Sequence, residues 1–135
     1  MSPRICLALG ACIAGLAIVL GAFGAHWLES QLPRWYVEPD RAEAMLANWE
    51  TGIRYQFYSA VGLMVLGLWA SQQADRRTTW VAANFVLGTL LFSGMLYAYV
   101  LTADKRFAMI VPLGGFSMIA GWLIFGWQAY RSPPP

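Results

Sequence analysis

Charged side chains are scarce in this sequence of 135 residues. Only 12% of the residues are Asp, Glu, Lys or Arg, whereas soluble domains carry about 25%. The few charges are also segregated, because none occurs within residues 5–28, 55–74, 78–103 or 107–130. Four long uncharged windows exclude an ordinary water-soluble domain and indicate that lipid is the main solvent of the chain.

Histidine and cysteine are equally scarce. His26 is the single histidine, and the two cysteines, Cys6 and Cys12, are six residues apart on an expected helix, where they face different sides and cannot bridge to each other. We therefore expect no metal site and no bis-histidine haem. The sequence also lacks a nucleophile elbow, a P-loop and a dinucleotide-binding motif. We expect no catalytic residues, no cofactor and no enzymatic activity.

Hydrophobic residues make up 59% of the chain, and its net charge of +2 is too small and dispersed for a nucleic-acid surface. A membrane-spanning helix needs roughly 20 apolar residues, and all four windows reach that length. Transmembrane β-strands would alternate apolar and polar residues, which these windows do not. The expected fold class is all-α, an integral membrane bundle of four antiparallel transmembrane helices. The expected spans are residues 5–27, 53–72, 79–101 and 107–127.

The first apolar window could alternatively be a secretory signal peptide. It is longer than the usual apolar run of about 7–15 residues, so we expect it to stay as a helix. Residues 1–131 are treated as a single domain, followed by a proline-rich tail at residues 132–135.

The longest connection is expected at residues 28–48, which are polar. Asp40 and Glu43 have the spacing of a capping box. The second helix should therefore begin near Arg41, outside the bilayer, with an amphipathic N-terminal part and a candidate bend at Gly52. The other two turns are short, which makes adjacent helices antiparallel neighbours.

Four spans would place both chain termini on one side of the membrane. The basic residues do not decide the orientation, because four lie on that side and five on the other. Arg4 precedes the first helix, which usually dominates, and so favours cytoplasmic termini. The nine basic residues are Arg4, Arg76, Arg77 and Arg131 on the terminal side, and Arg34, Arg41, Arg54, Lys105 and Arg106 on the other.

Small residues recur along the expected spans, and such residues let helices approach closely in lipid. A substrate path lined by glycines is the alternative interpretation. Trp and Tyr residues near the window ends, Trp49 among them, fit an interfacial aromatic belt. The expected helix-packing positions are Gly21, Gly24, Gly94, Gly114, Gly115 and Gly121.

One group of polar residues could carry chemistry. Glu50 and Arg54 have the i, i+4 spacing of a helical ion pair, and Tyr58 continues the same face. The group is either a satisfied polar anchor, in which Glu50 neutralises Arg54, or a proton-sensitive or anion-binding site. Its members are His26, Glu50, Arg54, Tyr55, Gln56 and Tyr58, with Glu29 close by in sequence.

Four ordered motifs carry a family resemblance: residues 21–26 (GAFGAH), 49–58 (WETGIRYQFY), 91–97 (LFSGMLY) and 112–116 (PLGGF). With them the chain resembles the YgdD-like family of small bacterial inner-membrane proteins, which has eukaryotic relatives in the transmembrane protein 256 group. The resemblance implies a four-helix membrane protein without an assigned activity. Ser59 stands where family members commonly have His, so a two-histidine site is not available here.

Two functions follow as hypotheses. The first is a non-enzymatic membrane protein that works by helix association, as a homo-oligomer or as an accessory subunit of a larger membrane complex. The alternative is a small transporter, or a binder of membrane lipid or a small molecule, that uses the charged cluster around His26, Glu50 and Arg54.

Overall fold

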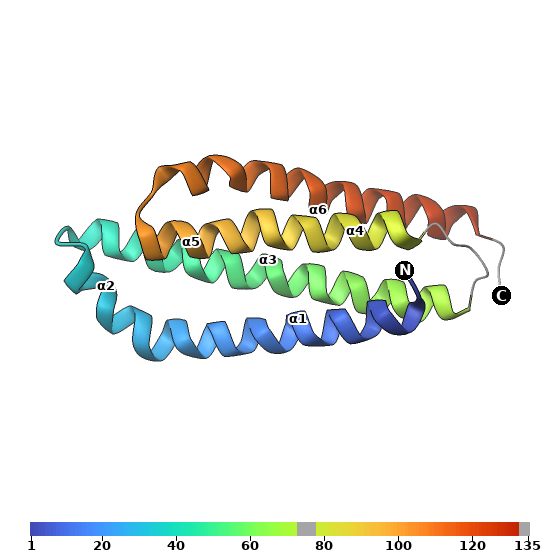
Figure 1. The fold of residues 1–135 in the computed structure, drawn as a ribbon, viewed down its shortest axis with the longest axis horizontal. Coiled ribbons are helices and arrows are strands. Elements are labelled where there is room, and N and C mark those ends of the chain that lie inside the picture. Colours follow the sequence, from blue (N-terminus) through green and yellow to red (C-terminus); the bar gives the residue numbers. More distant parts are fainter. Residues whose placement is uncertain (73–77, 133–135) are drawn as a thin grey trace.

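The computed structural model describes residues 1–72 and 78–132, and all regular secondary structure within them is helical. Consecutive segments run on without a break, so the chain forms four long helices side by side (Figure 1). The all-α class is confirmed. The segments are α1 (Pro3–Phe23), the π-helical η1 (Gly24–Leu28), α2 (Glu29–Trp35), α3 (Pro39–Ser71), α4 (Thr78–Thr89), the π-helical η2 (Leu90–Gly94), α5 (Met95–Thr102) and α6 (Lys105–Arg131).

Within the described residues, three of the four long helices are long and apolar enough to cross a membrane, namely Pro3–Trp35, Thr78–Thr102 and Lys105–Arg131. The remaining helix, α3, has the length but carries Arg54 and Gln56 just before its apolar part. It occupies the centre of the bundle and packs against α1, α4, η2 and α5. The expected turn at Asp75, Arg76 and Arg77 and the tail prolines Pro133 to Pro135 lie outside the described residues.

The first helix is longer than expected. Instead of ending near Trp27, it continues through η1 and α2 to Trp35, so the connection expected at residues 28–48 is largely helical. The physical reason is burial: Leu28, Leu32 and Tyr36 form one apolar cluster with Met45 and Trp49 of α3.

The second long helix begins at Pro39, with Glu38 as its N-cap residue and no side-chain capping bond. Pro fits the first helical position because its missing N–H would be unpaired there anyway, so Asp40 already lies inside the first turn and the expected capping box does not form. The helix α3 continues through Gly52. An added Cβ there would lie 2.7 Å from the Tyr97 ring.

The seam between α1 and α3 is closed over most of its length. A Cβ added at Gly10 would lie 2.8 Å from the carbonyl oxygen of Ala60, and one at Gly67 would lie 2.9 Å from the carbonyl oxygen of Pro3. Without side chains at these two positions the helices approach almost backbone to backbone, which is how small residues drive association in lipid.

The six glycines expected to pack against neighbouring helices differ in their surroundings. Gly24 meets Trp49, Gly121 meets Phe85, and a Cβ at Gly114 would collide with the backbone of Phe92. Gly115 has ordinary contact with Phe92. The expected contacts are absent at Gly21 and Gly94, where an added Cβ would meet no atom within 4 Å.

The interior contains two apolar clusters, one toward each end of the bundle. Phe85, Leu63 and Cys6 belong to the cluster near the N-terminus, and Leu28 and Trp49 belong to the cluster at the opposite end. The buried polar residues Gln56, Ser59 and Ser93 belong to neither cluster. A polar section therefore interrupts the apolar core.

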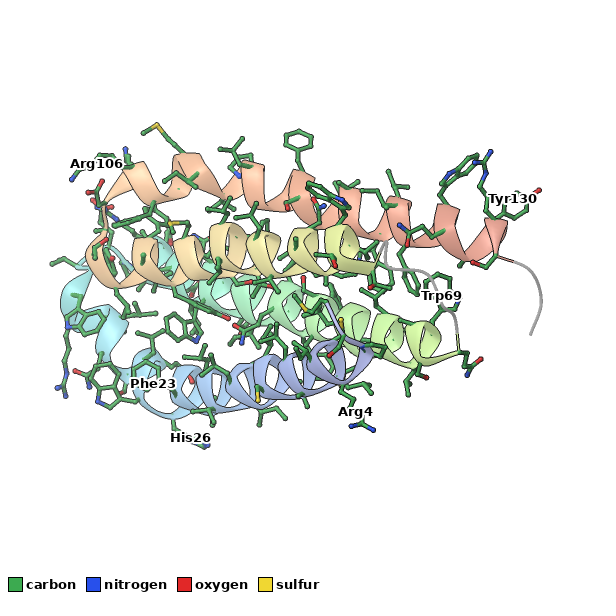
Figure 2. All side chains as sticks on the ribbon, turned by 45° about the vertical axis from the view of Figure 1, so that its right-hand side comes forward. Arg4, Phe23, His26, Trp69, Arg106 and Tyr130 are labelled. Carbon is green, nitrogen blue, oxygen red and sulfur yellow. The ribbon has the colours of Figure 1, made fainter. Side chains whose placement is uncertain are left out.

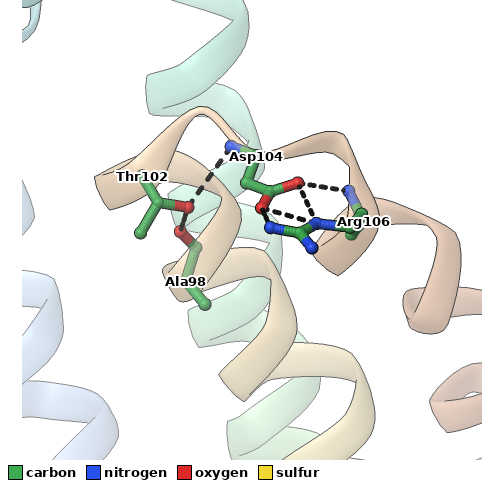
Figure 3. Close-up of polar contacts among 4 residues, drawn as sticks. All are labelled: Ala98, Thr102, Asp104 and Arg106. Carbon is green, nitrogen blue, oxygen red and sulfur yellow. Dashed lines mark hydrogen bonds and ion pairs between the residues drawn. The ribbon is translucent and has the colours of Figure 1, made fainter.

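The turn between α5 and α6 is fixed by Asp104, the N-cap residue of α6 (Figure 3). Its carboxylate accepts hydrogen bonds from the backbone and side chain of Arg106 and forms an ion pair with it at 2.7 Å. The hydroxyl of Thr102 accepts from the Asp104 N–H at 3.3 Å. The hydrogen bonds from Arg106 hold the pKa of the Asp104 carboxyl below its usual value.

Candidate functional site

The polar residues grouped from the sequence separate into an inner and an outer set. Gln56 points into the bundle and is only 2% exposed, whereas Glu50, Arg54 and Tyr58 are exposed. The cause is helical geometry, because residues two apart on α3 face different directions.

The inner set is a hydrogen-bonded network around Gln56. Its amide Nε2 donates to the carbonyl oxygen of Ile13 at 2.9 Å, and its Oε1 accepts from the Tyr97 hydroxyl at 2.9 Å. The rings of Trp49 and Tyr97 pack in a tilted arrangement with centroids 4.6 Å apart, and the Trp49 Nε1 donates to the carbonyl oxygen of Leu20 at 3.0 Å. The network joins α3 to α1 on one side and to α5 on the other.

The sequence identified Gln56 but missed Trp49 and Tyr97 as its companions. Trp49 is 2% exposed, so it is not a residue of the aromatic belt. Its burial depends on Gly24, whose missing side chain leaves room for the indole. In the sequence, the GAFGAH motif, which contains Gly24, is the signal that could have indicated a large side chain packed against this part of the first helix.

Two buried hydroxyls lie one helical turn from this network. The Oγ atoms of Ser59 and Ser93 have no hydrogen-bond partner within the described structure. Ser59 follows Gln56 by one turn on α3, and Ser93 precedes Tyr97 by one turn in the π-helical segment η2. A buried hydroxyl without a partner costs about 1–3 kcal/mol, so this section of the core is less well satisfied than the network beside it.

Glu50 and Arg54 of the outer set line an open cavity of about 410 Å³ between η1 and α3. Glu29, Glu50 and Arg54 bring three charges to it. The guanidinium of Arg54 donates to the hydroxyl of Thr51 at 3.3 Å. Among the described residues Glu50 and Arg54 form no ion pair, so the expected neutralisation is absent. The other lining residues are Gly21, Gly24, Ala25, Leu46, Trp49 and Ile53.

A second cavity of about 450 Å³ continues the first toward the middle of α1 and α3. The two share Gly21, Ile53 and Arg54, and the second is otherwise lined by Ala17, Ile18, Ala22, Phe57 and Tyr58. We call the two cavities together the α1–α3 groove. Gly21 borders both, and because nothing lies within 4 Å of its missing Cβ, the space it leaves belongs to the groove.

His26 and Tyr55 do not take part in the groove. His26 lies on the outer face of η1 and points away from the bundle (Figure 2). Tyr55 stacks on Phe92 of η2, with ring centroids 4.5 Å apart. The structure therefore brings Glu50, Arg54 and Tyr58 together with Glu29 in one groove and places the other three predicted residues elsewhere.

Comparison with known proteins identifies a family. The model of the family described as protein of unknown function DUF423 matches residues 20–115, which include Gly21, Glu50 and Arg54 of the groove. No solved structure matches the chain.

Individual relatives match over almost their whole length. A UPF0382 membrane protein of Staphylococcus haemolyticus is 34% identical over 90% of this chain and 91% of its own. YwdK of Bacillus subtilis is 35% identical over 90% of this chain and 92% of its own. The inner membrane protein YgdD of Escherichia coli is 30% identical over 92% and 88%. The resemblance found in the sequence motifs is confirmed, and the chain belongs to the DUF423 family of UPF0382 membrane proteins.

Proposed function

We propose that this protein is a non-enzymatic integral membrane protein that binds a membrane phospholipid in the α1–α3 groove. The observation that carries the proposal is the division of the groove, whose outer cavity contains Glu29, Glu50 and Arg54 while its inner cavity is lined mainly by apolar side chains such as Ile18 and Phe57. A phospholipid has the same division, with a charged headgroup joined to an apolar chain.

The bilayer position of the groove supports this occupant. E. coli YgdD is named an inner membrane protein, and we place this chain in the same membrane. We infer that α3 is the fourth span, because it runs antiparallel along α1 from Gly67, beside Pro3, to Trp49, beside Gly24. Arg54 then lies where the apolar part of α3 ends, at headgroup depth, and Arg4 favours cytoplasmic termini.

The charged side chains of the groove have no evident role in stabilising the fold. Gln56 carries two hydrogen bonds that join three helices, whereas Arg54 bonds, among the described residues, only to Thr51, one turn away on its own helix. Ionisable residues at the edge of a membrane need polar partners. A phosphate group in the outer cavity would give the guanidinium such a partner.

The experiment is to measure phospholipid retained by the purified protein with native mass spectrometry, in a mild detergent. We expect the wild type to retain phospholipid and Gly21→Leu to lose it, because the new side chain fills the groove. Gly15→Leu is the matched control, since Gly15 is also on α1 with open space around it but does not line the groove. Equal retention by both variants would contradict the proposal.

Association between copies of the chain is a second candidate function. Ala11, Cys12 and Gly15 are exposed together on the outer face of α1, and small residues favour close helix contacts in lipid. Cys12 is exposed whereas Cys6 is buried, so mild oxidation of native membranes should produce a disulfide-linked dimer that Cys12→Ser abolishes. A chain that stays monomeric in membranes under these conditions would exclude this contact.

A further inference from the structure

We propose that the α1–α3 groove selects phospholipids whose headgroup ends in a primary amine, as in phosphatidylethanolamine. This inference rests on the proposed function and adds the chemical class of the ligand. Its basis is the order in which apolar, basic and acidic side chains follow one another along the groove.

The order begins with apolar side chains in the inner cavity, where Ile18, Ala22 and Phe57 line the wall. Arg54 comes next and belongs to both cavities. Glu50 lies one turn beyond Arg54 on α3, and Glu29 faces the same cavity from the start of α2. From the membrane outward, the groove therefore presents an apolar wall, then one cation, then two carboxylates.

An ethanolamine phospholipid presents the complementary groups in the same order. Its acyl chain lies deepest, its phosphate comes next and its ammonium group is outermost. A guanidinium binds phosphate through two parallel N–H donors, and a carboxylate accepts hydrogen bonds from an ammonium N–H. Arg54 would hold the phosphate, while Glu29 and Glu50 would hold the ammonium group.

The same arrangement discriminates against other headgroups. Of the described residues that line the outer cavity, Arg54 is basic and Glu29 and Glu50 are acidic. A choline headgroup carries the positive charge but has no N–H to donate. A phosphatidylglycerol headgroup carries a net negative charge and would meet two carboxylates without bringing a cation. The expected order of preference is therefore phosphatidylethanolamine, then phosphatidylcholine, then phosphatidylglycerol.

The test uses the full chain in nanodiscs that contain equal amounts of dioleoyl phosphatidylethanolamine, phosphatidylcholine and phosphatidylglycerol. After transfer to mild detergent, native mass spectrometry identifies the lipids that stay bound. We expect phosphatidylethanolamine to be enriched over phosphatidylcholine roughly two- to fivefold, the range that exposed charge pairs supply.

Three variants assign the preference to side chains. Glu29→Gln combined with Glu50→Gln should remove the preference for ethanolamine over choline among the phospholipids that stay bound. Arg54→Gln should lower the retention of all three lipids. Asp40→Asn is the control, because it removes an exposed carboxylate of α3 outside the groove and should retain the full preference.

The outcomes separate the two proposals. Retained lipid that mirrors the composition of the nanodisc, with Gly21→Leu still reducing its amount, would overturn the headgroup inference and leave the lipid-binding function standing. A preference for ethanolamine that survives loss of both glutamates would also overturn the headgroup inference. Retention that does not depend on Gly21 would overturn both proposals.

Discussion

The same two helices, α1 and α3, make a closed seam and an open groove. In the seam, Gly10 lets the carbonyl oxygen of Ala60 approach, and Gln56 bonds across to the backbone of α1. In the groove, a Cβ added at Gly21 would meet no atom of another helix within 4 Å, and the hydrogen-bond partner of Arg54 among the described residues is Thr51. A glycine and a polar side chain occur in both the seam and the groove. Residue type alone therefore does not distinguish residues that hold the helices together from residues that line a candidate binding site. The difference is whether each group has a partner inside the fold.

The largest expected effect comes from blocking the seam. Gly10→Leu would force a side chain against the α3 backbone, which cannot move aside, so we expect a loss of stability of about 3 kcal/mol. Gly15→Leu, in open space on the same helix, should change stability by less than about 0.5 kcal/mol. Thermal unfolding in detergent, followed by circular dichroism, measures both. Equal unfolding temperatures would mean that the seam is not closed.

A smaller effect is expected from the network inside the bundle. Gln56→Leu removes the acceptor of the half-buried Tyr97 hydroxyl and should cost about 1–2 kcal/mol. Adding Tyr97→Phe removes the orphaned group, so the double variant should be less destabilised than the sum of the two single variants, with a coupling of about 1 kcal/mol. A double-mutant cycle on unfolding free energies measures this. Additive effects would show that the bond contributes nothing.

Neutralising the groove should leave the fold intact. Arg54→Gln and Glu50→Gln affect exposed side chains without an ion pair to each other, so we expect stability changes within about 0.5 kcal/mol. The same unfolding assay, in lipid-free detergent, tests this. A loss of stability in either variant as large as that of Gln56→Leu would show that the charged residues stabilise the fold. That result would favour the satisfied polar anchor over the binding site.

The smallest effect is expected far from both regions, at the α5–α6 turn. Because the folded-state pKa of Asp104 is lowered by Arg106, its contribution to stability is present above the usual Asp pKa and is lost as pH falls through the lowered value. The unfolding temperature of Asp104→Asn should therefore decrease less than that of the wild type as the pH is lowered. If the unfolding temperature of Asp104→Asn decreased at acidic pH as much as that of the wild type, groups other than Asp104 would cause the acid sensitivity.

The sequence predicted the positions of the helices better than it predicted which residues of each helix are buried. The lack of charge in four windows indicated the four long helices, because a charge inside lipid is costly wherever it lies. The end of the first helix was misplaced, because Leu28 and Leu32 become buried only through contact with Met45 and Trp49 of α3. Such burial depends on tertiary packing, which a composition window does not contain.

The site was predicted only in part, because tertiary packing also decides which side chains of α3 meet. The i, i+4 spacing correctly placed Glu50 and Arg54 on one face of α3, but it also suggested an ion pair that the side chains do not form. Gln56 was grouped with them by proximity in sequence, although it points inward to Tyr97. Gly21 looked like a packing residue, and only the structure shows that nothing packs on it.

Photo-crosslinking is the most direct measurement of the central claim, that a phospholipid occupies the α1–α3 groove. A phospholipid with a diazirine near the top of its acyl chain would be incorporated into membranes, activated, and located by peptide mass spectrometry. We predict labelling concentrated at residues 17–22 of α1 and 53–58 of α3 and lost in Gly21→Leu. Labelling spread evenly over exposed side chains of α6, such as Leu113 and Phe116, without enrichment at the groove, would contradict the account.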